Sequence, residues 1–387
     1  MDAGRGLSRP DRAAGGEGAT ARLTFPHMGT LYIPLETLLS DLGAEVVVPP
    51  PCTQRTLELG TRIAPEGACL PLKVGLGNFL EAEEQGAEAV VMAGGSGPCR
   101  FGYYAQVQRE VLRGAGSGLE MIVLEPPQGH LRALLEELRR WLPGFTLRRS
   151  WKAFQLAWAK ILAIDEVERA LQAARATEAV RGQADAAFAR FLTACRRADS
   201  PRRVKTLQAE AAAELEALPK REGPVLRVGV VGEIYTVLEP FVNLHTERRL
   251  GLLGVQVVRR LFLGDWIREH LFRLRVRRER LRLAELAMPH LNHFVGGHGL
   301  ETVAHSVEFA REGIAGVVQL APLTCMPEIV AETVLPEVTE KYGLPTLTLF
   351  VDEHTGEAGL QTRLEAFVDL LAGRGAPGRQ GLTRPSP

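Results

Sequence analysis

The run Ala89-Val90-Val91-Met92-Ala93, followed directly by Gly94-Gly95-Ser96-Gly97-Pro98-Cys99, decides the fold class of this chain. A short apolar run rich in β-branched residues predicts a buried strand, and the Gly/Pro segment predicts a loop at its carboxyl end. Similar strand-like runs lie at 21–29, 45–48 and 120–124. Stretches with helical spacing separate them, at 35–42, 73–85 and 103–113. Strands that alternate with helices imply a parallel sheet, so we expect an α/β domain over residues 21–127.

The C-terminal part of the chain repeats this layout. Strand-like runs occur there at 226–232, 255–263, 316–321 and 345–351. The segment between the two α/β regions, from about 129 to 219, is rich in Ala, Leu, Arg and Glu with helical spacing. Pro143 and Pro201 mark breaks between its helices. We therefore predict an α/β protein with two parallel-sheet, Rossmann- or flavodoxin-like domains. Their expected bounds are 21–127 and 224–372, with a helical module over 128–223 and disordered ends at 1–20 and 373–387.

The composition excludes several classes of protein. The 387 residues include 46 Lys and Arg against 46 Asp and Glu, so no long-range field favours nucleic acid or an anionic membrane. No apolar run reaches the length that crosses a bilayer, and the first twenty residues lack the apolar core of a signal peptide, so we expect a cytoplasmic protein. Five widely spaced cysteines argue against a disulfide framework and leave metal binding, catalysis or burial.

Three of the cysteines, Cys69, Cys99 and Cys325, lie in loop-like phrases close to a proline. Cys99 and Cys325 each follow a strand-like run, and the two runs belong to different domains. Loops at the carboxyl ends of parallel strands hold ligands, so these thiols are candidates to meet between the sheets and bind an iron–sulfur cluster. Three thiolates would leave one iron open to substrate or water. The wide spacing lacks the compact ferredoxin pattern, so three buried structural thiols remain the alternative.

The other two cysteines have weaker signals. Cys195 lies in the helical module and is most simply a core thiol. Cys52 follows three prolines after a strand-like run, so it could face the same cleft.

Two residues are candidates for catalysis. Glu233 and His354 each follow a strand-like run of the second domain and could reach the cleft, as a general acid or as partners of the cluster ligands. The alternative is that these segments supply helix caps and salt bridges between loops.

An arginine-rich stretch runs from Arg268 to Arg282. It could bind the phosphates of coenzyme A or an acidic face of a partner protein. The alternative is a solvated arginine face on an amphipathic helix.

Several phrases together resemble one family, the acyl-CoA dehydratase activase-related proteins, which are relatives of the 2-hydroxyglutaryl-CoA dehydratase subunits. The resemblance covers residues 23–373. Its motifs are Glu66–Gly75, Gly95–Tyr104, Gly232–Tyr235 with Leu238–Asn243, Gly296–Gly299, Thr324–Val330 and Asp352–Gly359.

This resemblance implies an oxygen-sensitive [4Fe–4S] cluster held by Cys69, Cys99 and Cys325 between two parallel-sheet domains. It also implies a partner, an ATP-hydrolysing iron–sulfur activator that delivers a single low-potential electron. The implied reaction is that of a lyase, loss of water from a 2-hydroxyacyl-CoA thioester. True dehydratases pair related subunits, whereas members of this group are often single chains, so a homodimer or heterodimer stays open. A non-catalytic, cluster-bearing electron relay or accessory partner of the activator is the alternative function.

Overall fold

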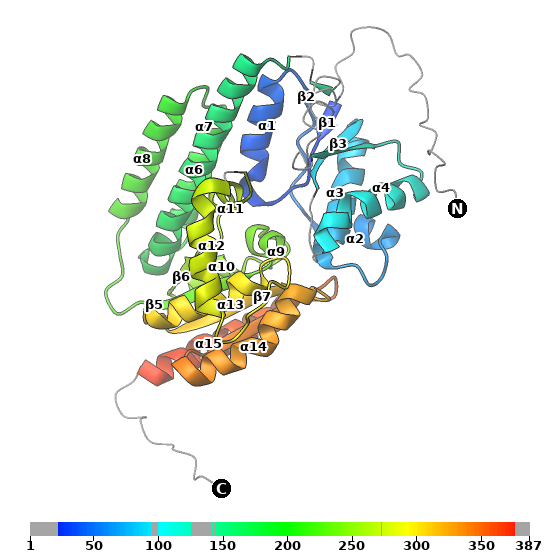
Figure 1. Ribbon diagram of the computed structural model, residues 1–387. Coiled ribbons are helices and arrows are strands. Elements are labelled where there is room, and N and C mark those ends of the chain that lie inside the picture. The colour runs from blue at the N-terminus through cyan, green and yellow to red at the C-terminus, as the bar shows by residue number, and fades with distance from the viewer. Residues whose placement is uncertain (1–21, 95–99, 125–140, 143, 272, 376–387) are drawn as a thin grey trace, which may run out of the picture.

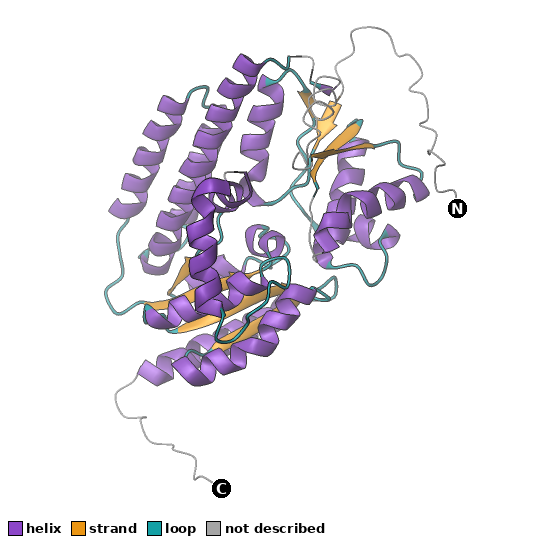
Figure 2. Cartoon of the chain, viewed as in Figure 1, coloured by secondary structure: helices purple, strands orange, loops and turns teal. Residues whose placement is uncertain are grey.

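The computed structural model describes residues 22–94, 100–124, 141–142, 144–271 and 273–375. Within these residues the chain forms two separate four-stranded sheets in which every pairing is parallel. Figure 2 shows the two sheets apart from each other, with helices around them. The α/β fold with two parallel-sheet domains, expected from the sequence, is confirmed.

The N-terminal sheet has the strand order β2-β1-β3-β4. Its strands are β1 (Arg22–Thr24), β2 (Glu45–Val46), β3 (Ala89–Ala93) and β4 (Glu120–Leu124). The helices of this region are η1 (Gly29–Leu31), α1 (Tyr32–Asp41), α2 (Gln54–Ile63), α3 (Leu70–Glu84), η2 (Arg100–Tyr103) and α4 (Tyr104–Gly114). Successive side chains of β3 point to opposite faces of the sheet. Val90 packs with Leu76 and Phe79 of α3, whereas Ala89 packs with Leu39 of α1.

The C-terminal sheet has the matching order β6-β5-β7-β8. Its strands are β5 (Leu226–Gly232), β6 (Val255–Arg259), β7 (Gly316–Pro322) and β8 (Thr346–Val351). The helices of this region are α9 (Ile234–Leu238), α10 (Thr246–Leu252), α11 (Leu263–Leu271), α12 (Arg273–Ala287), α13 (Gly299–Arg311), α14 (Met326–Tyr342) and α15 (Glu357–Gly375). Val318 of β7 packs with Leu364 of α15, and Val317 packs with Phe309 of α13, so helices cover both faces.

In the described part of the connection between the two sheets, three long helices follow one another: α6 (Leu147–Thr177), α7 (Gln183–Arg197) and α8 (Pro201–Ala217). Helix α1 lies beside them, and Ile33 joins the core that Val167, Phe191 and Leu207 form (Figure 1). Helix α1 therefore packs on two sides, because Leu39 lies in the core of the N-terminal sheet and Ile33 lies in the core of the helical module.

Most observed elements lie close to the expected ranges. Strands β1 and β2 end earlier than their runs, at Thr24 and Val46, and two further elements differ. The strand-like run 255–263 forms strand only to Arg259, because Phe262 leaves the sheet and packs under two guanidinium groups, with Arg169 3.9 Å and Arg259 4.4 Å from the ring centroid. Helix α15 continues to Gly375, past the expected start of the C-terminal tail at residue 373. The expected N-terminal tail, 1–20, lies outside the described residues. No helix in the described parts of the chain combines the length and hydropathy needed to span a membrane.

Candidate functional site at the domain interface

In both sheets the strand order reverses at the first strand of the sheet, β1 in one and β5 in the other. From β1 the chain adds β2 on one side and β3 on the other, and β5 is flanked by β6 and β7 in the same way. In open parallel sheets the crevice at such a switch point, outside the carboxyl ends of the strands, is the usual ligand site. The loops that leave these strands carry His27 after β1, Glu233 after β5 and Cys325 after β7.

The two domains meet through these loops. An apolar cluster joins Cys52, Leu70 and Val74 of the N-terminal domain to Tyr235 and Val351 of the C-terminal domain. Gly29 allows the closest approach, since a Cβ atom there would lie 2.3 Å from the Leu238 carbonyl oxygen. Gly29 also has a φ of +52°, in the left-handed region that glycine adopts at little cost. The switch points of the two sheets are therefore held together by direct packing.

Cys69 and Cys325 lie at equivalent positions, each at the N-terminal end of a helix with a proline in its first turn. The side chains are buried, with 6% and 9% of their surface exposed. Their loops touch, because the Thr324 hydroxyl donates to the Gly67 carbonyl oxygen at 3.5 Å. Burial raises the pKa of the Cys325 thiol, and the charges of Glu233, Glu328 and Cys69 add to that effect. The structure thus brings these two cysteines, 256 positions apart, to one interface.

The backbone beside Cys325 is strained. Thr324 has a φ of +70°, in the left-handed region that a β-branched residue rarely occupies. Such strain costs on the order of 1–3 kcal/mol and is concentrated at functional sites. Here it coincides with the Thr324–Gly67 contact that joins the two cysteine loops.

Cys99 lies outside the described residues. The chain before it ends strand β3 at Ala93, and the chain after it enters α4 at Tyr104. The Tyr104 hydroxyl contacts the Cys69 sulfur.

Glu233 caps a helix at the interface. Its carboxylate accepts hydrogen bonds from the backbone N–H groups of Tyr235 at 3.0 Å and Thr236 at 2.9 Å, and from the Thr236 hydroxyl at 2.9 Å. Burial raises the pKa of this carboxyl, and the hydrogen bonds oppose the rise. The capping role that the sequence left open is present, and it occurs within electrostatic range of Cys325.

His354 is exposed, and its segment forms a turn. Its backbone N–H donates to Asp352 Oδ1 at 3.0 Å, and the Thr355 hydroxyl donates to the same oxygen at 2.7 Å. The residue before it, Glu353, faces the other domain and forms an ion pair with Lys73. Lys73 lies one turn after Cys69 and is 4% exposed. Lys73 was not predicted as a site residue. Its position as the one cation in the apolar run 70–79 is a signal in the sequence for a buried ion pair.

A second polar cluster lies at the same interface and was also missed. His27 Nδ1 lies 2.9 Å from Glu239 Oε2 and 3.8 Å from the Cys52 sulfur. All three side chains are at least nine-tenths buried. Cys52, a weaker candidate from the sequence, lies in the apolar cluster that joins the two domains. His27 and Glu239 gave no periodic or motif signal that would have paired them.

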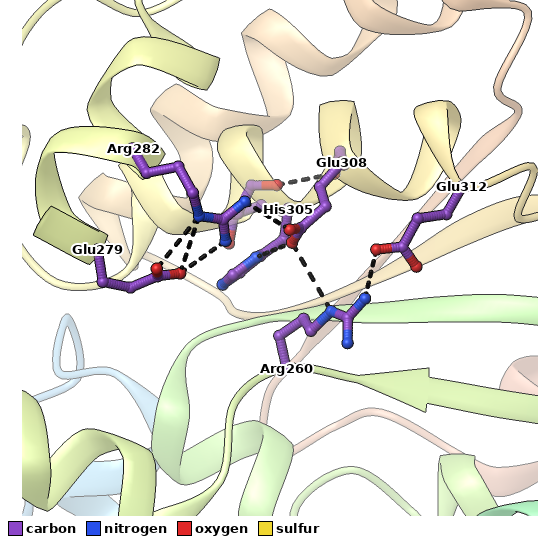
Figure 3. A network of polar contacts seen from close by, with 8 residues as sticks. Arg260, Glu279, Arg282, His305, Glu308 and Glu312 are labelled. Carbon is purple, nitrogen blue, oxygen red and sulfur yellow. Dashed lines mark hydrogen bonds and ion pairs between the residues drawn. The ribbon is translucent and has the colours of Figure 1, made fainter.

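The arginine-rich stretch is partly neutralised within the chain. Arg268 pairs with Asp265 at 2.8 Å. Arg282 pairs with Glu279 at 2.6 Å and with Glu308 at 2.7 Å, in the network drawn in Figure 3. At these two positions the structural interpretation is favoured over phosphate binding. Between them, Arg280 is exposed, and the side chains of the arginines at 273, 275, 277 and 278 lie outside the described residues.

Comparison with known proteins adds no assignment. No protein-family model matches this chain, and no curated protein matches it. The residues that meet at the domain interface are therefore the basis for a functional proposal.

Proposed function

We propose that this chain is an iron–sulfur protein that holds a [4Fe–4S] cluster between its two parallel-sheet domains, with Cys69, Cys99 and Cys325 as the thiolate ligands. The observation that carries the proposal is the meeting of the Cys69 and Cys325 loops across the interface, with the Thr324 hydroxyl 3.5 Å from the Gly67 carbonyl oxygen. Buried thiols on two touching loops from different domains are a donor set suited to iron.

The surroundings of the two described cysteines fit this assignment. Each precedes a helix of at least fifteen residues, whose N-terminal amides carry partial positive charge. Thiolates are stabilised at such positions, and metal ligation deprotonates a thiol outright. The described cysteines, Cys52, Cys69, Cys195 and Cys325, are free thiols, which agrees with a reducing cytoplasmic setting.

We propose that the activity resembles that of the 2-hydroxyacyl-CoA dehydratases, within the acyl-CoA dehydratase activase-related group. An ATP-hydrolysing activator would supply the electron, and the bound cluster would supply one-electron chemistry and a Lewis-acidic iron. Of the two candidate catalytic residues, Glu233 is the one whose charge acts on Cys325. Burial raises the pKa of Glu233, which is the direction that a general acid requires.

The alternative, an electron relay or accessory partner of the activator, is favoured by one specific observation. Both Glu233 oxygens are already engaged in capping α9, and His354 is exposed on its turn. A relay needs the cluster ligands and a docking surface, but no general acid. The two functions therefore differ in whether the protein changes a substrate.

Iron content tests the cluster. Protein prepared without oxygen should be brown and contain about four irons per chain. Cys69→Ser, Cys99→Ser and Cys325→Ser should each lose the cluster, while Cys195→Ser, which removes a buried thiol in the helical module, should keep it. Full iron content in the three single variants would disprove the ligand assignment.

A thioester panel separates the two functions. The anaerobic protein is mixed with the activator, ATP, a reductant and several 2-hydroxyacyl-CoA thioesters, and loss of water is followed by mass. Conversion of one thioester supports the lyase. Cluster reduction by the activator without binding or conversion of any thioester supports the relay.

A further inference from the structure

The His27–Cys52–Glu239 cluster has the composition and spacing of a metal site. One nitrogen, one sulfur and one carboxylate oxygen lie within 4.8 Å of one another. The three residues are 7%, 8% and 3% exposed. Their elements differ: His27 follows β1, Cys52 precedes α2, and Glu239 follows α9. Two ligand atoms thus come from the N-terminal domain and one from the C-terminal domain.

The distances are close to those of a tetrahedral ion. With bonds of about 2.0–2.1 Å to nitrogen or oxygen and about 2.3 Å to sulfur, a tetrahedral Zn²⁺ separates nitrogen from oxygen by about 3.3 Å and sulfur from nitrogen by about 3.6 Å. The corresponding separations are 2.9 Å for His27 and Glu239 and 3.8 Å for Cys52 and His27. Shifts of a few tenths of an ångström bring these two pairs to the expected values, and the Cys52 sulfur and a Glu239 oxygen lie within 4.8 Å of each other.

The charges favour a divalent cation. One thiolate and one carboxylate would balance the two charges of a divalent ion, with His27 bound as neutral imidazole. A sulfur, nitrogen and oxygen set selects a borderline ion such as Zn²⁺ over Mg²⁺ or Ca²⁺.

Outer partners already orient the three ligands. The Asn78 side-chain oxygen, fully buried, accepts the His27 backbone N–H at 2.9 Å and lies 3.8 Å from the Cys52 sulfur. Glu239 Oε2 also accepts the Gly29 backbone N–H at 2.7 Å, and its other oxygen accepts that of Phe241 at 3.2 Å. Such outer hydrogen bonds fix ligand direction in protein metal sites.

We propose that His27, Cys52 and Glu239 bind one divalent transition-metal ion of the Zn²⁺ class, at a site distinct from Cys69, Cys99 and Cys325. Three protein ligands leave a fourth position for water or another ligand. Because the ligands come from both domains, the ion also joins the domains. This proposal does not depend on the presence of an iron–sulfur cluster.

The test uses Co²⁺ as a spectroscopic substitute for Zn²⁺, on the full chain after removal of metals by a chelator. Titrations are run without oxygen on the wild type and on a Cys69→Ser/Cys325→Ser variant, which lacks two of the proposed cluster ligands. We expect the second protein to bind one Co²⁺ per chain with a thiolate-to-cobalt charge-transfer band. Zn²⁺ should displace the Co²⁺ and abolish the band.

Further substitutions in the Cys69→Ser/Cys325→Ser variant identify the metal ligands. Cys52→Ser should abolish the charge-transfer band. Glu239→Gln should weaken Co²⁺ binding by more than roughly 10–100-fold, which is the cost of losing an outer hydrogen-bond partner. Cys195→Ser is the matched control and should change neither. A band that survives Cys52→Ser and disappears with Cys99→Ser would overturn the proposal. If Cys52→Ser fails to fold, the titration of the Cys69→Ser/Cys325→Ser variant still tests the site. Absence of one-to-one Co²⁺ binding, or of a thiolate-to-cobalt band, in that variant refutes the proposal.

Discussion

The Nδ1 atom of His27 lies 2.9 Å from the Oε2 atom of Glu239, although 212 positions separate the two residues. One follows the first strand of the N-terminal sheet, and the other follows the first helix after the matching strand of the C-terminal sheet. The contact is buried, and Glu239 also accepts the backbone N–H groups of Gly29 and Phe241. It joins the two domains at the interface where the Cys69 and Cys325 loops also touch.

The first prediction concerns the close approach at Gly29. Gly29→Ala should destabilise the protein by about 2 kcal/mol more than Gly313→Ala, measured by urea unfolding. Both glycines have positive φ, +52° and +69°, so both variants lose the conformational advantage of glycine. Only Gly29 faces another backbone atom, whereas Gly313 has no atom within 4 Å of an added Cβ. Equal losses would mean that the Leu238 contact is unimportant.

The second prediction concerns the ion pair between the domains. Glu353→Gln should cost about 3–5 kcal/mol of unfolding free energy, because it leaves the buried Lys73 ammonium without its partner. Lys73→Met should cost much less, since the Glu353 side chain is 24% exposed and can be hydrated. Breaking the exposed Arg203–Glu210 pair with Arg203→Gln is the control and should cost less than about 1 kcal/mol. The reverse order of the first two variants would contradict this account.

The third prediction is a pH dependence at Asp165. Burial, assisted by the nearby charge of Glu168, raises the pKa of this carboxyl to about 7, and its side chain accepts the Gly264 N–H at 2.8 Å. A raised folded-state pKa favours the protonated form, so its stabilising contribution is complete below about pH 4 and is lost as pH rises through 7. Asp165→Asn should therefore gain stability relative to wild type as pH rises from about 4 to about 7, by up to about 1.4 kcal/mol per pH unit, and the difference should level off above that.

Chemical denaturation at several pH values measures this difference. Asp369→Asn, a change at an exposed position on α15, is the control and should give a difference that does not vary with pH. A constant difference for Asp165→Asn as well would show that Asp165 is ionised in the folded protein throughout this range.

The fourth prediction follows from the proposed lyase function. Turnover should require the activator and ATP, because the cluster must receive an electron at a potential that ordinary ferredoxins do not easily reach. The electron is returned at the end of each cycle, so ATP consumption should be far below the amount of product. ATP hydrolysis equal to or above product formation would contradict a recycled electron.

The strands and the class of fold were readable from the sequence, because burial on both faces of a parallel strand requires a local run of apolar, β-branched residues. The runs at β3, β4, β5 and β7 therefore appear within a residue of their predicted ends. The placement of Cys325 at the start of a helix after a strand was likewise a local property, as was the burial of Cys195.

Only the tertiary structure decided which loops meet. Nothing in the local pattern around His27, Cys52 or Glu239 specifies its partners, because a contact between distant loops depends on how whole domains dock and not on periodicity. The same reason explains the pairing of Lys73 with Glu353, 280 positions away, and the packing of α1 on the helical module. Sequence periodicity encodes which side of an element is buried; the docking of the two sheets determines what lies against it.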